Sequence, residues 1–155
     1  MSDPFTDAYT TDAFTIDVNH APSAEEQAAA QNGWLWAYNV SQTGDDRYTP
    51  LVISLRDGSG AVVGGLVGGY LWGWLKIESF SMEPSLRGRG FGTKLFLAAQ
   101  DDARERGCLN IWVDTYSFQA RPFYERFGFE VFGELGDYPP GHTLYCMRKR
   151  LEPAQ

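Results

Sequence analysis

Three glycines at alternate positions, Gly88, Gly90 and Gly92, lie where a strand-like run gives way to a helical run. Glycines let successive backbone N–H groups turn inward, and the start of the following helix adds the positive end of its dipole. Such a turn can hold a pyrophosphate without a dedicated cation, and Arg87 and Arg89 would strengthen the positive field. The segment therefore predicts an anion-binding loop; the alternative is a flexible loop with two solvated arginines.

The spacing of these glycines distinguishes three kinds of phosphate loop. A dinucleotide fingerprint has glycines at its first, third and sixth positions, whereas here they fall at the first, third and fifth. A Walker A loop needs Gly-Lys-Ser/Thr, but Thr93 separates Gly92 from Lys94. Both spacings disfavour a nucleotide-binding domain of another class. The pattern that fits is Arg-x-x-Gly-x-Gly, beginning at Arg87.

This pattern resembles the acetyl-CoA motif of the GNAT superfamily of N-acetyltransferases, in which a strand also precedes the loop. A second segment, residues 120–129, has the sequence Ala-Arg-Pro-Phe-Tyr-Glu-Arg-Phe-Gly-Phe. It is similar to the family's Ala-x-x-Phe-Tyr-x-x-x-Gly-Phe segment. The two motifs occur in the expected order, and the resemblance covers most of the chain from about Phe14 onward.

The resemblance implies an α/β (mixed α+β) GNAT-type fold. Its central sheet is mixed but mostly antiparallel, has about six or seven strands with a splayed parallel pair, and is flanked by helices. In the family the pantetheine arm of acetyl-CoA enters the gap between the splayed strands, which here implies main-chain contacts from Phe80, Ser81 and Met82. The pyrophosphate loop that it implies consists of Arg87, Gly88, Arg89, Gly90, Phe91, Gly92 and Thr93.

Acyl transfer from a thioester to an amine needs a neutral amine and a proton for the departing thiolate. The resemblance implies that Tyr124, the tyrosine of the second motif, is the general acid; the alternative is an ordinary packed aromatic. A phenol with a pKa of about 10 stays protonated at neutral pH and so has a proton to give. Glu78 is the best-placed carboxylate for a general base, and an ion pair with Lys76 is the competing interpretation. Asp114 and His142 are weaker alternatives for the base.

One position departs from the family pattern. The family often has asparagine three residues before the alanine that aligns with Ala120, and Ser117 stands there with Gln119 nearby. Either the Ser117 hydroxyl or the Gln119 amide replaces the cofactor contact, or the contact is absent.

Local patterns predict the elements that position these residues. Alternating apolar and polar residues predict a first strand over 14–18, and a capping box at Ser23 begins a helix expected to reach about Tyr38, with a polar loop over 41–47. A helix crosses between two later strands, 75–82 and 108–114, which predicts that they are parallel. The other expected strands are 50–55, 61–70, 129–134 and 143–150, and the other expected helices are 91–106 and 122–128.

Composition limits the class of protein. The 155 residues favour one domain, residues 13–155, after a flexible arm over residues 1–12. The net charge of −7 argues against nucleic-acid binding and favours a cationic partner. No apolar stretch could span a bilayer and the acidic start is not a secretory signal, so we expect no membrane partner and a cytoplasmic location. Cys108 and Cys146 are not spaced as metal ligands, so no metal is expected.

The function that the resemblance implies is transfer of an acetyl group from acetyl-CoA to a primary amine of a small, cationic substrate, by direct attack in a ternary complex. The alternative is a non-catalytic acyl-CoA-binding or regulatory module. Polyamines, aminoglycoside-like drugs, amino acids and protein lysines are all compatible acceptors. Trp72 and Trp74 pack on the core or form an edge for a second subunit, which leaves a homodimer open.

Overall fold

The structure is a computed structural model that describes residues 14–31 and 33–152. It contains two compact units, of which the first ends at Gly44 and the second begins at Asp45. The expected N-terminal arm, residues 1–12, lies outside the described residues. No helix in the described ranges is long and apolar enough to cross a membrane.

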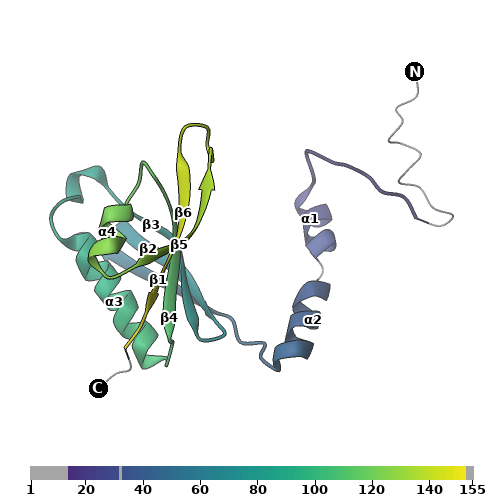
Figure 1. Ribbon diagram of the computed structural model, residues 1–155, viewed down its shortest axis with the longest axis horizontal. Helices are drawn as coiled ribbons and strands as arrows, with labels where there is room; N and C mark the ends of the chain where they lie inside the picture. The colour runs from purple at the N-terminus through teal and green to yellow at the C-terminus, as the bar shows by residue number, and fades with distance from the viewer. Residues whose placement is uncertain (1–13, 32, 153–155) are drawn as a thin grey trace. The chain divides into compact units, whose positions relative to one another are not determined.

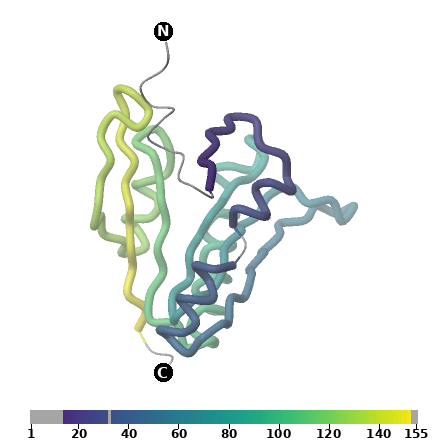
Figure 2. Tube along the Cα trace, turned by 90° about the vertical axis from the view of Figure 1, so that its right-hand side faces the viewer, coloured from purple at the N-terminus to yellow at the C-terminus, as the bar shows by residue number. Residues whose placement is uncertain are grey.

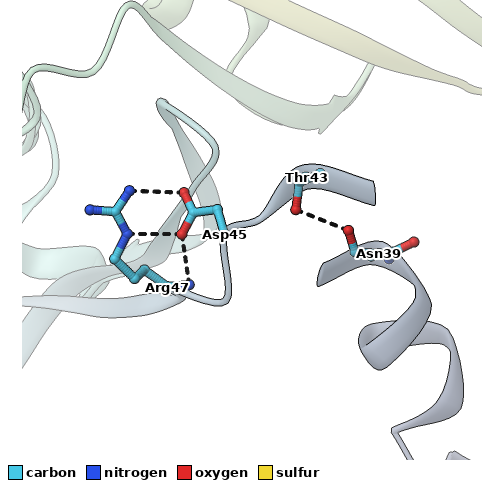
Figure 3. Close-up of polar contacts among 4 residues, drawn as sticks. All are labelled: Asn39, Thr43, Asp45 and Arg47. Atoms are coloured by element: carbon cyan, nitrogen blue, oxygen red, sulfur yellow. Dashed lines mark hydrogen bonds and ion pairs between the residues drawn. The ribbon is translucent and has the colours of Figure 1, made fainter. Parts of the chain in front are cut away.

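The first unit contains two helices, α1 (Ala24–Gln31) and α2 (Trp34–Thr43). The backbone N–H of Glu26 donates to Ser23 Oγ at 3.1 Å, which confirms the predicted cap. A single helix ending near Tyr38 is wrong, because Gly33 adopts a left-handed conformation (φ 69°) that interrupts it. The second helix then continues into the expected loop, where the Thr43 hydroxyl donates to the Asn39 carbonyl at 2.9 Å (Figure 3).

The strand expected over 14–18 is also wrong. Phe14 forms an isolated bridge, and the described residues from 15 to 19 form no strand. Alternation of apolar and polar residues is satisfied by any extended segment, whereas a strand also needs a neighbour with which to exchange hydrogen bonds.

The second unit is built on one sheet of six strands (Figure 1). The strand order is β1-β2-β3-β4-β6-β5, and neighbours are antiparallel except for β3 and β4, which are parallel. This arrangement confirms the predicted mixed sheet and its parallel pair. The strands are β1 (Thr49–Arg56), β2 (Val62–Leu71), β3 (Trp74–Met82), β4 (Asn110–Tyr116), β5 (Glu130–Gly136) and β6 (Thr143–Arg150).

Helices α3 (Phe91–Glu105) and α4 (Arg121–Arg126) pack on one face of this sheet (Figure 1). Phe96 of α3 and Tyr124 of α4 are both buried and belong to the same hydrophobic core. Burial of these apolar side chains is the main favourable contribution to folding. The strand residues of the core are Leu66, Tyr70, Leu75, Ile77, Ile111, Val113 and Met147.

The parallel strands β3 and β4 pair over only part of their length. Their Cα partners run from Trp74 with Asn110 to Ile77 with Val113, although both strands continue beyond that point. Figure 2 shows the two strands adjacent at one end and diverging toward the other. The predicted splayed pair is therefore present, and its gap opens at the carboxyl ends of the strands.

An extra residue, Glu78, forms a β-bulge in β3 where the two strands part. Gly68 and Val67 are successive residues of β2, yet they lie opposite Ile77 and Ser79, so Glu78 has no partner of its own. A β-carbon on Gly68 would collide with the β3 carbonyl oxygen that precedes Ile77. The bulge thus depends on a very close approach of the two backbones.

The second unit begins with an ion pair between Asp45 and Arg47 (Figure 3). One carboxylate oxygen of Asp45 accepts bonds from Arg47 Nε at 2.8 Å and from the Arg47 backbone N–H at 3.0 Å. The side-chain hydrogen bond is the main reason why the pKa of Asp45 falls to about 2. These contacts fix the turn that leads into β1.

A buried tyrosine joins β2 to α3. The Tyr70 hydroxyl donates to Asp102 Oδ2 at 2.5 Å, and the same oxygen accepts a bond from Arg106 Nε at 2.9 Å. The bond from Tyr70 is the main cause of the lowered pKa of Asp102. Burial and the bond to Asp102 raise the pKa of Tyr70 well above its usual range.

We expect Tyr70→Phe to lower the free energy of unfolding by about 1–2 kcal/mol at pH 7, because the variant loses a hydrogen bond to a charged group. A lowered carboxylate pKa stabilises the folded state above the unfolded pKa of about 3.9. The difference between the two proteins should therefore shrink as the pH falls below about 4. Urea denaturation at a series of pH values from 7 to 3 measures this difference in the free energy of unfolding. Tyr48→Phe, at an exposed residue, is the control. A constant difference at every pH would contradict the assignment.

Candidate active site

A cleft of about 970 Å³ opens where β3 and β4 separate. Residues 77–82 of β3 and 113–115 of β4 line it consecutively. Because successive residues of a strand point to opposite faces, the cleft reaches both faces of the sheet. The start of α3 and the helix α4 complete its walls.

The loop between β3 and α3 has the geometry of an anion cradle. After a 3-10 turn, η2 (Pro84–Leu86), Gly88 and Gly90 adopt left-handed conformations with φ of 72° and 83°. The N–H groups of the first turn of a helix have no intrahelical acceptors, and in the described part of the chain no side chain caps the start of α3. Arg87 lines the same end of the cleft. Positive charge and free N–H donors are what a pyrophosphate needs.

Most of the predicted cofactor residues line this cleft. Arg89 and Phe91 are described residues that do not line it; the Arg89 guanidinium lies over the Phe91 ring at 5.4 Å from its centroid. The predicted cofactor residues that line the cleft are Phe80, Ser81, Met82, Arg87, Gly88, Gly90, Gly92 and Thr93.

Tyr124 combines burial with access to the cleft. Its side chain is 4% exposed, and its ring packs against Phe123 and Phe129 with centroid distances of 5.4 Å. Burial raises the pKa of Tyr124 to about 12. The phenol is therefore neutral at physiological pH and can donate a proton into the cleft that it lines.

Glu78 lines the cleft from the bulge and is exposed to solvent. The competing interpretation placed it in an ion pair with Lys76, but no such pair exists among the described residues. Lys76 instead lies over the Trp112 ring, with Nζ at 4.6 Å from the centroid. The bulge separates the two residues, because it breaks the alternation that would have put them on one face. Asp114 of β4 also lines the cleft.

Ser117 and His142 lie together beside the cleft. Neither is among the described residues that line it. Ser117 Oγ is 3.1 Å from His142 Nδ1 and accepts a bond from the Thr143 N–H at 3.3 Å. Gln119 does line the cleft, and its Oε1 accepts a bond from the Tyr116 N–H at 2.9 Å. Ser117 thus joins two loops.

The residues of the cleft that sequence reasoning missed include Arg126, Phe123 and Phe118. Arg126 lies in the last turn of α4, with its guanidinium 5.6 Å from the centroid of the Phe123 ring. The position of Arg126 within the second motif was the available signal that it lies near the site. Phe118 lies in a loop with no periodic pattern, so no local signal could have placed it.

No group of three or more His, Cys, Asp or Glu side chains in the described ranges could hold a metal ion.

Comparison with known proteins gives a consistent picture. The model of the acetyltransferase (GNAT) family matches residues 8–129. The acetyltransferase Atu2258 of Agrobacterium fabrum is 36% identical over 117 residues, 76% of this chain and 85% of that protein. A blasticidin-S acetyltransferase of Streptomyces morookaense is 40% identical over 93 residues, 59% of this chain and 68% of that protein. A crystal structure from Agrobacterium tumefaciens, provisionally assigned as an acetyltransferase, superposes with a TM-score of 0.82 at 33% identity, covering 88% and 99% of the two chains.

The raised pKa of Tyr124 can be measured directly. In protein labelled with ¹³C at tyrosine Cζ, we expect the Tyr124 resonance to keep its position up to about pH 11, because burial disfavours the charged phenolate. The resonance is assigned by its absence from Tyr124→Phe. A midpoint near the ordinary value of about 10 would contradict the buried environment.

Proposed function

The chain belongs to the GNAT family of acetyltransferases, and on this premise we propose that it transfers the acetyl group of acetyl-CoA to a primary amine of a small, cationic acceptor. The observation that carries the proposal is the cleft between β3 and β4, which combines an anion cradle with a neutral, buried phenol. Direct attack in a ternary complex fits a cleft that reaches both faces of the sheet.

The residues of the cleft suit acetyl-CoA. The N–H groups at the start of α3 and the guanidinium groups of Arg87 and Arg126 would hold the phosphates. The unpaired end of β3, from Phe80 to Met82, offers backbone donors and acceptors to the amide-bearing arm. When bound, acetyl-CoA supplies an activated acyl group as a thioester. Ser117 stays a proposed contact, and its bonds to the neighbouring loop favour an indirect role.

Two side chains then transfer the protons of the reaction. Tyr124 holds a proton on its hydroxyl oxygen and donates it to the departing sulfur. Glu78 accepts the proton of the acceptor's ammonium group, directly or through a water molecule. Its place at the bulge supports this role, because the carboxylate lines the cleft without an ion-pair partner among the described residues.

Binding of the cofactor can be tested at Gly90. Gly90→Ala should weaken CoA binding at least 10-fold, because an alanine resists the left-handed conformation that aims the loop's N–H groups. Gly60→Ala is the matched control, since Gly60 has φ of 88° in the β1–β2 turn, away from the cleft. Calorimetric titration with CoA and with ATP measures both variants. Equal affinity of the two variants for CoA, or preference for ATP, would count against the proposed loop.

The role of the acid can be tested at Tyr124. Tyr124→Phe should lower kcat about 10²-fold or more while CoA affinity stays within about twofold, because only the proton donor is lost. Tyr145→Phe is the control, as Tyr145 lies on β6 outside the cleft lining. With wild-type protein, the rate should rise with pH as the ammonium group of the acceptor loses its proton, and should not fall by pH 10 because the pKa of Tyr124 is about 12.

A panel of primary amines, assayed by release of free thiol from acetyl-CoA, provides these rates. Full activity of Tyr124→Phe would show that Tyr124 is not the general acid. Tight binding of acetyl-CoA without turnover of any amine would instead favour the non-catalytic acyl-CoA-binding module.

A further inference from the structure

The cleft is electrically polarised. Its lining includes two cations, Arg87 and Arg126, and two carboxylates, Glu78 and Asp114. The arginines come from the segment before α3 and from α4, which are on the helix-covered face of the sheet. Asp114 faces the other way, because Val113 and its alternate neighbours on β4 point into the core. An anion is therefore favoured on one side of the sheet and a cation on the other.

Three aromatic rings extend the acidic side of the cleft, and we refer to them as the aromatic shelf: Tyr116, Phe118 and Tyr138. The rings of Tyr116 and Phe118 are stacked, with centroids 5.2 Å apart and an interplanar angle of 5°. The ring of Tyr138 is tilted by 42° to that of Tyr116, with centroids 6.0 Å apart. Tyr116 and Asp114 alternate with buried residues of β4, so both lie on the same face.

The shelf is exposed yet held in place. Phe118 is 57% exposed and lines the cleft, and Tyr138 is 54% exposed. The Ser117 N–H donates to the Thr143 carbonyl at 2.8 Å, which ties the loop after β4 to the start of β6. The rings of His142 and Phe118 contact each other at an interplanar angle of 80°, with centroids 4.8 Å apart. The hydrophobic core contains none of the shelf rings, so core packing does not explain their positions.

These features match one kind of ligand. The face of an aromatic ring attracts a cation and stacks on a flat group. The Asp114 carboxylate lines the cleft, and its two oxygens can accept hydrogen bonds from a cationic group. A flat cation can therefore stack on a ring face and pair with a carboxylate at the same time. A tetrahedral ammonium lacks the flat face for stacking, and a neutral ring lacks the charge for pairing.

We propose that the aromatic shelf and Asp114 bind the acceptor through a flat cationic group, such as an amidinium, a guanidinium or a protonated heteroaromatic ring. The ring of Phe118 contacts the face of this group, and the Asp114 carboxylate pairs with its charge. The inference rests on the proposed acetyl transfer and names the class of its acceptor. It makes Phe118 and Asp114 residues that determine specificity.

Binding of benzamidine, which is flat and cationic but offers no primary amine, tests the proposal without turnover. Benzamide has the same shape without the charge, and cyclohexylmethylamine has the charge without the flat ring. We expect calorimetric titration to show saturable binding of benzamidine, at least threefold tighter than of either other compound. Phe118→Leu and Asp114→Asn should each weaken it about 3- to 10-fold. Phe132→Leu, on a phenylalanine of β5 that is 51% exposed and lies outside the cleft, is the matched control and should leave the benzamidine affinity unchanged.

Equal affinity for the three compounds, no binding of benzamidine, or benzamidine affinity that is unchanged in both Phe118→Leu and Asp114→Asn would overturn the proposal. The titrations are run with saturating CoA and again without it. Failure of CoA to bind counts against the acetyltransferase proposal, whereas the benzamidine series reports on the shelf alone. The two proposals therefore fail in distinguishable ways.

Discussion

Backbone pairing between β3 and β4 stops after Ile77 and Val113, and the site depends on that interruption. Paired strands would satisfy each other's N–H and C=O groups and leave no room between them. Separated strands leave a row of backbone donors and acceptors on each wall of the gap. The bulge at Glu78 provides the separation, since an extra residue bends the strand that carries it.

The core keeps the other parts of the site at the edges of this gap. Phe123 packs edge-on against Phe80 of β3, at 5.7 Å, and against Phe96 of α3, at 6.2 Å. The next residue along α4 is Tyr124, so the position of the phenol is fixed by contacts to both the strand and the helix. A short helix of six residues could not hold a side chain in place alone. Packing against the sheet and α3 supplies the rigidity that proton donation requires.

Features specified by nearby residues could be predicted from the sequence. The glycine loop, the helix after it and the parallel pair follow from spacing and from one crossover, and the structure has all three. The bulge was not predicted, although the sequence carries a local signal for it: apolar residues alternate at Leu75 and Ile77, and the phase then shifts by one residue before Phe80. The glycine that accommodates the bulge lies on β2, far from it in the sequence. Phe118 reaches the cleft only through contacts with residues far along the chain, such as His142. Gly33 was available as a signal for the break between α1 and α2, but the helical run around it outweighed it.

Gly68 shows how such a site can fail without any change to its chemical groups. It does not line the cleft, and only the lack of a side chain lets the Lys76 carbonyl oxygen lie against it. Even a methyl group there would push β3 back at the residue before the bulge. In a mutational scan, position 68 would score as intolerant although no substrate touches it. A directed-evolution library restricted to residues that contact ligands would therefore omit a position that sets the width of the gap.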